Sequence, residues 1–212
     1  FTKQRTPTEQ QQARYELAAD EIRQNNETKA LQWLNGLENR YKILTPHIWA
    51  LRAQAHSLNR KTDQAQKTWK QIIEKFPQSA AAGEAYYALG KTDPQYWDQA
   101  IATLPAHPRS VEIAVQRLKK NPNDRGLLML IAQYGLHLNN YKTYLDHLTQ
   151  KFGPQLNPQD WQTIAFGYWE KLHYKEAGRA YSHAPTTSRN AYRVGRGLQL
   201  GHEDKVALTA YQ

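Results

Sequence analysis

Three arginines, Arg189, Arg193 and Arg196, follow one another at spacings of four and three residues. In a helix these spacings place all three side chains on one face, with Tyr192 beside them. Guanidinium groups bind carboxylates and phosphates through paired hydrogen bonds, so this stripe is a candidate anion-binding site. The alternative is a solvated basic face with the tyrosine buried behind it.

Trp33, Trp97 and Trp169 are the tryptophans that the helical repeat described below explains least. If they are exposed, their indole rings offer flat surfaces for stacking on sugar rings. If they are buried, they are packing residues. We therefore add Trp169 to the candidate ligand-binding residues, beside the arginine stripe and Tyr192.

Other chemistry is hard to place in this chain. The eight histidines form no ligand-spaced cluster, and there is no cysteine, so we predict no metal site and no thiol nucleophile. The adjacent carboxylates Asp20–Glu21 and Glu203–Asp204 point in different directions on a helix, which does not suit acid–base catalysis of glycoside cleavage. We predict no catalytic residue and no cofactor.

Composition indicates a folded helical protein. The chain has 212 residues, of which 40% are hydrophobic and 22% charged. A mean hydropathy of −0.85 is typical of a molecule with much surface per residue. The longest apolar run is too short to cross a bilayer. The net charge is +9, but the basic residues are scattered along the chain and do not form a continuous patch, so we expect no nucleic-acid partner.

A repeated spacing of small and large residues predicts how the helices pack. Two small residues stand twelve apart, and a large residue follows the second after four more, as in Ala165, Ala177 and Tyr181. The small pair lets two helices approach closely while the large residue fills the space beside them. The predicted repeat positions are Ala18, Ala30, Ala53, Ala65, Trp69, Ala88, Ala100, Trp161, Ala165, Tyr168, Ala177, Tyr181, Gly195 and Ala207.

Turn residues separate these runs. Asn-rich and Gly-rich dipeptides and seven prolines lie where one helix must end and the next begin. Residues 109–153 lack the alanine spacing and are read as helices over 110–120, 124–138 and 140–152. We predict an all-α solenoid of about six helical hairpins over residues 12–212, with a flexible tail over residues 1–11.

The repeat resembles a tetratricopeptide repeat. In "DWQTIAFGYWEKLHYKEAGRAYSHAP", residues 160–185, Trp161, Ile164, Ala165 and Tyr168 are followed by alanine and an aromatic residue. Residues 49–77 follow the same pattern and end in proline. The resemblance implies a tetratricopeptide-like, right-handed superhelix.

A second resemblance covers nearly the whole chain. Segments such as "KTDPQYWDQA" and "RNAYR" are similar to the superhelical (U-type) region of soluble lytic murein transglycosylases of the cyanobacterial type. This resemblance implies a non-catalytic scaffold in the periplasm or cell envelope, with peptidoglycan strands as partner. The family's catalytic Glu-Ser pair does not occur here. The resemblance therefore implies a segment truncated at its C-terminal end, before a lysozyme-like domain that cleaves the glycan.

A different class of function stays open beside this one. Helical repeats commonly present a concave groove to a protein or peptide, so a protein-binding adaptor is the alternative to a murein-binding scaffold. Both hypotheses make this segment a binding surface rather than an enzyme.

Overall fold

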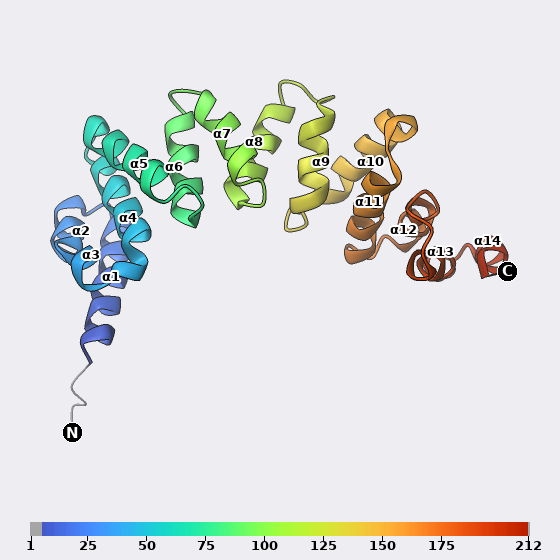
Figure 1. The fold of residues 1–212 in the computed structure, drawn as a ribbon, viewed down its shortest axis with the longest axis horizontal. Helices are drawn as coiled ribbons and strands as arrows, with labels where there is room; N and C mark the ends of the chain where they lie inside the picture. The colour runs from blue at the N-terminus through green and yellow to red at the C-terminus, as the bar shows by residue number, and fades with distance from the viewer. Residues whose placement is uncertain (1–5, 212) are drawn as a thin grey trace. The chain divides into compact units, whose positions relative to one another are not determined.

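The computed structural model describes residues 6–211, and every regular element in that range is a helix (Figure 1). The chain divides into two compact units, residues 1–110 and residues 111–212. The helices up to this division are α1 (Pro7–Arg23), α2 (Glu27–Leu34), α3 (Leu37–Arg40), the 3₁₀ helix η1 (Lys42–Leu44), α4 (Thr45–Leu58), α5 (Thr62–Lys75), α6 (Ala80–Gly90) and α7 (Gln95–Thr103).

Helix α8 (Pro108–Leu118) contains the division between the units. The elements after it are α9 (Arg125–Tyr134), α10 (Tyr141–Phe152), the 3₁₀ helix η2 (Gly153–Gln155), α11 (Pro158–Glu170), α12 (Tyr174–Tyr181), α13 (Ser188–Leu200) and α14 (Asp204–Tyr211). The three helices predicted between residues 110 and 152 are therefore present, with α9 ending four residues earlier than expected.

Consecutive helices pack as hairpins. The described residues form six such pairs, namely α1/α2, α4/α5, α6/α7, α9/α10, α11/α12 and α13/α14. Within each unit successive pairs stack on one another, as α2 does on α4 and α12 on α13. The fold is thus the all-α, tetratricopeptide-like stack of hairpins that the spacing predicts. The handedness of a superhelix stays a prediction.

Each unit has its own hydrophobic core. In the first unit Ala18, Leu34, Leu37 and Ile48 are fully buried against one another. In the second unit Tyr141 lies in the core, and its hydroxyl donates to the carbonyl of Ala132. Burial raises the pKa of the Tyr141 phenol to about 12, so it stays protonated at neutral pH.

Most of the predicted repeat positions lie in these cores. Ala165, Ala177 and Tyr181 are buried, and only Ala88 and Trp161 among the fourteen positions are half-buried. In the α6/α7 pair the close approach occurs at Gly90 instead of Ala88. A side chain on Gly90 would collide with the indole ring of Trp97.

The start of the fold differs from the prediction. Helix α1 begins at Pro7, where Thr6 and Glu9 form a reciprocal capping box. Residues 7–11 are therefore helical and do not belong to a tail. The remainder of the predicted tail, residues 1–5, lies outside the described residues. Within residues 6–211 no helix is long and apolar enough to cross a membrane.

Four hairpin turns share one backbone conformation. Asn25, Arg60, Leu172 and His202 each stand between the two helices of a pair with φ between 57° and 62°. This left-handed region is unfavourable for residues with a Cβ atom, and a leucine has no side-chain hydrogen bond that compensates.

Replacing Leu172 with glycine is therefore expected to stabilise the protein by about 0.5–1 kcal/mol. The side chain is 67% exposed, so little packing is lost with it. Urea denaturation measures the effect. Leu172→Ala is the control, because alanine removes the same side chain but keeps the strained backbone. Equal stability of the two variants would contradict the explanation.

Candidate functional site

A groove in the second unit contains part of the arginine stripe. Its walls come mainly from α9, α11 and α13, the first helices of three consecutive pairs, and its volume is about 350 Å³. The side chains that line it are Gln133, Gln162, Thr163, Phe166, Tyr181, Arg189, Asn190 and Arg193. The groove is thus polar and cationic, with one exposed aromatic ring, since Phe166 is 46% exposed.

Side-chain caps fix where the three wall helices begin. Asp124 accepts from the backbone N–H of Leu127 at the start of α9. Asn157 forms a capping box with Asp160 at the start of α11. Thr187 accepts from the backbone N–H of Asn190 and begins α13. Because α13 begins at Ser188, Arg189 and Arg193 stand one turn apart at its N-terminal end.

Arg193 is held in place by aromatic rings. Its guanidinium carbon lies 5.4 Å from the ring centroid of Trp169 and 5.1 Å from that of Tyr181. It also donates a hydrogen bond to the Tyr181 hydroxyl. Burial raises the pKa of the Tyr181 phenol, although the charge of Arg193 acts in the opposite direction. The phenol is therefore neutral and leaves the charge of Arg193 uncancelled.

The other members of the stripe lie in different surroundings. Arg189 lines the groove and is exposed. Arg196 lies outside the groove lining and donates to the side-chain oxygen of Gln199 at 2.9 Å. Tyr192 is 59% exposed and is also outside the lining, so it is not buried behind the arginines. The structure thus places Arg189 and Arg193 in one groove, with Trp169 in contact with Arg193 but outside the lining, and leaves Tyr192 and Arg196 outside the groove.

Asn190 also lines the groove, one residue after Arg189. It is buried, and its amide donates to the carbonyl of Pro185 at 2.8 Å and to Gln162 at 3.4 Å. The bond to Gln162 connects the start of α13 to α11, and the bond to Pro185 connects it to the segment that precedes α13. Phe166 was missed altogether, because a single phenylalanine among core aromatics carries no distinguishing signal.

Two of the three tryptophans proposed for sugar stacking, Trp97 and Trp169, have aromatic packing partners. The Trp97 indole donates to the carbonyl of Tyr87 at 3.1 Å and stacks on its ring. Trp169 contacts Tyr174 and Tyr181 edge to face and is half-buried. Trp33 alone of the three is exposed.

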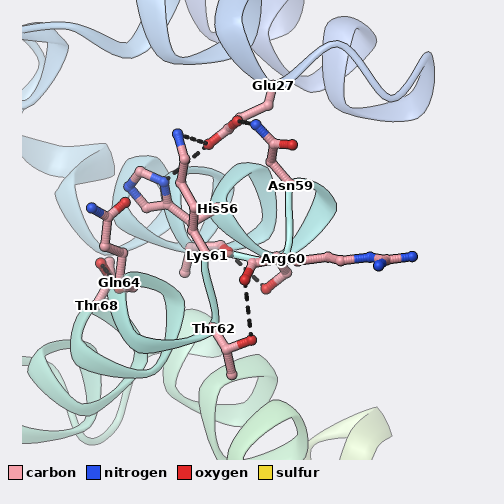
Figure 2. Close-up of polar contacts among 10 residues, drawn as sticks. Glu27, His56, Asn59, Arg60, Lys61, Thr62, Gln64 and Thr68 are labelled. Carbon is pink, nitrogen blue, oxygen red and sulfur yellow. Dashed lines mark hydrogen bonds and ion pairs between the residues drawn. The ribbon is translucent and has the colours of Figure 1, made fainter.

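A buried carboxylate in the first unit forms a second polar cluster. Figure 2 shows Glu27 extending from α2 toward His56, Asn59 and Lys61, at the end of α4 and in the turn that follows. Glu27 accepts from Asn59 Nδ2 at 2.5 Å and from Lys61 Nζ at 3.1 Å, and its distance to His56 Nδ1 is 3.3 Å. Burial opposes its charge, but these partners outweigh it and hold the pKa of Glu27 below the ordinary value.

This cluster borders a hollow of about 650 Å³ that also contains an Arg52–Glu38 ion pair at 2.9 Å. Its charged groups satisfy one another, so we interpret the Glu27 cluster as a connection between the first two hairpins. Among the residues that the structure describes, no group of three or more histidine, aspartate or glutamate side chains is arranged to hold a metal ion.

The fold and the groove together define a helical-repeat protein with an open, cationic surface on its second unit. Neither a family model nor a curated protein matches the chain.

Two solved structures are similar to the chain, both with low sequence identity and a low TM-score. One is the C-terminal part of a TPR repeat-containing protein from Cytophaga hutchinsonii, with 16% identity, a TM-score of 0.38, and coverage of 93% of this chain and 76% of that one. The other is a thermophilic TPR protein from Thermus thermophilus, with 16% identity, a TM-score of 0.33, and coverage of 94% and 99%.

Proposed function

We propose that this chain is a non-catalytic interaction module that binds an extended segment of another polypeptide in the groove of its second unit. The observation that carries the proposal is the lining itself. Side chains from α9, α11 and α13 converge on one depression, and Phe166 presents an aromatic ring there to solvent.

This combination is typical of a peptide site rather than of a reaction centre. A partly exposed aromatic ring offers apolar area at little cost in side-chain entropy, and such rings are common binding hot spots. Glutamine and threonine side chains around it supply donors and acceptors for a peptide backbone. The groove is open and small, which suits a short segment bound with modest affinity.

The test is selection from a displayed peptide library against the purified chain, followed by fluorescence anisotropy with the selected peptides. Phe166→Ala is expected to weaken binding about tenfold or more, as for a hot-spot residue. Ile43→Ala is the matched control, because Ile43 is an 80% exposed apolar residue of the first unit, outside the groove. No selectable peptide, or equal binding by both variants, would disprove the proposal.

A scaffold role in a murein transglycosylase of the cell envelope stays a separate proposal. It is supported only by the resemblance of the sequence, and its envelope location has the same basis. Cosedimentation of the chain with isolated murein is the expected result under that proposal. If the Phe166→Ala variant cosediments with murein as well as the unaltered chain does, murein binds a different surface from the peptide groove.

A further inference from the structure

Two positive charges in the groove lack a partner. Among the described residues, neither Arg189 nor Arg193 forms an ion pair with a carboxylate. Other arginines of the same unit do, since Arg125 lies 2.8 Å from Asp160 and Arg179 lies 2.8 Å from Glu203. The two groove arginines are therefore available to an anionic ligand.

The two arginines also differ in mobility. Arg193 is fixed over Trp169 and Tyr181 and has one nitrogen bonded to the Tyr181 hydroxyl, so its orientation is set before a ligand arrives. A fixed guanidinium loses less entropy on binding than a free one. Arg189 is exposed and adjusts to the ligand. This pair suits one anchored contact and one adaptable contact.

Helix geometry sets the spacing of the anions. The two arginines are four positions apart in α13, which is a rise of about 6 Å along the helix axis. In an extended peptide, side chains two residues apart point the same way and stand about 6.6–6.8 Å apart. Two acidic residues separated by one residue therefore match the spacing of the two arginines along the helix axis.

We propose that the groove recognises an extended acidic segment with carboxylates at alternate positions, one bound by Arg193 and one by Arg189, and an apolar side chain against Phe166. This proposal rests on the proposed function and names the ligand class for the same groove.

Carboxylates suit the site better than phosphate. One Arg193 nitrogen is already bonded to Tyr181, and the Asn190 amide donates to Pro185 and Gln162. The remaining lining side chains are neutral. Each bound anion thus faces about one positive charge. That charge neutralises a carboxylate, but it leaves about one negative charge of a phosphate dianion without a counter-charge.

The experiment uses peptide arrays with identical randomised flanks and four fixed cores. The cores are Glu-x-Glu, Gln-x-Gln, two adjacent glutamates, and phosphoserine-x-phosphoserine. The strongest binders of each array are resynthesised, and their dissociation constants are measured by fluorescence anisotropy at low and high salt. The proteins are the unaltered chain, Arg189→Gln, Arg193→Lys and Arg196→Gln.

We expect Glu-x-Glu peptides to bind about tenfold or more tightly than every other array, and less tightly as salt rises. Arg189→Gln should weaken them about tenfold and leave Gln-x-Gln peptides unchanged. Arg193→Lys keeps the charge but loses the planar group, so it should also weaken them. Arg196→Gln removes the same charge from the same helix outside the groove and should change binding less than twofold.

The failures of the two proposals are distinguishable. If Gln-x-Gln peptides bind as well as Glu-x-Glu peptides and Phe166→Ala still weakens binding about tenfold or more, the groove binds peptides but the acidic specificity is wrong. Tighter binding of phosphoserine peptides, or equal effects of Arg189→Gln and Arg196→Gln, overturns the carboxylate assignment. If no array binds, both proposals fail.

Discussion

Replacing Gly197 with alanine is expected to destabilise the second unit by roughly 2–3 kcal/mol, because α12 and α13 cross with their backbones in contact. A Cβ atom on Gly197 would stand 2.9 Å from both the backbone nitrogen of Gly178 and the carbonyl oxygen of Tyr174. A Cβ on Gly178 would in turn stand 2.9 Å from the nitrogen of Leu198. Backbone atoms cannot rotate away as a side chain does, so the helices must separate.

Gly126→Ala is the matched control for this prediction. Gly126 is also helical, but its Cβ would meet only a side-chain oxygen of Asp124 at 3.4 Å, an ordinary contact. Alanine there should stabilise α9 by up to about 1 kcal/mol through helix propensity. Urea denaturation of both variants measures the difference. Stabilisation by Gly197→Ala would show that the crossing is looser than the contacts imply.

Replacing Glu27 with glutamine is expected to cost about 2–3 kcal/mol at neutral pH. The variant leaves Lys61 and Asn59 beside a neutral side chain at a position that is only 5% exposed, and at least one donor loses its charged acceptor. The estimate lies below that for a fully buried ion pair because the Lys61 side chain is 45% exposed. Asp20→Asn is the control, since it breaks an exposed ion pair with Arg23 and should cost less than about 1 kcal/mol.

The effect of Glu27 should depend on pH in a defined direction. A carboxyl whose pKa is lowered in the folded state stabilises that state fully above the unfolded pKa, about 4.3, and loses this contribution as pH falls through the lowered pKa. The stability difference between the unaltered chain and Glu27→Gln should therefore be largest near pH 7 and shrink at acidic pH. A difference that is constant from pH 7 to about pH 3 would contradict the assigned charge.

The repeat was predictable because it depends on volume at fixed spacing. Small residues such as Ala165 and Ala177 and large ones such as Tyr181 are visible in the sequence, and the structure buries all three. Ala88 shows the limit of this reasoning. The close approach of α6 to α7 occurs at Gly90, two positions further along the chain. The spacing of the alanines alone does not show which of the two small residues lies at the helix contact.

The candidate site was predictable only in part, because it depends on contacts between helices distant in sequence. The spacing of the arginines places Arg189, Arg193 and Arg196 on one face, but which of them meets a groove depends on where α11 lies. Phe166 belongs to the site for the same reason. The Glu27 cluster joins Glu27 to Asn59, which lies 32 positions further along the chain, so no local sequence pattern predicts it.

The four left-handed turns have a consequence for engineering. Asparagine, arginine, leucine and histidine occupy the same backbone state there, and all four side chains are exposed. The helices on either side, and not the identity of the tip residue, therefore dictate that geometry. Such tips tolerate inserted chain. A reporter dye or a grafted epitope attached at residue 172, where the side chain is 67% exposed, would leave the folded hairpins undisturbed.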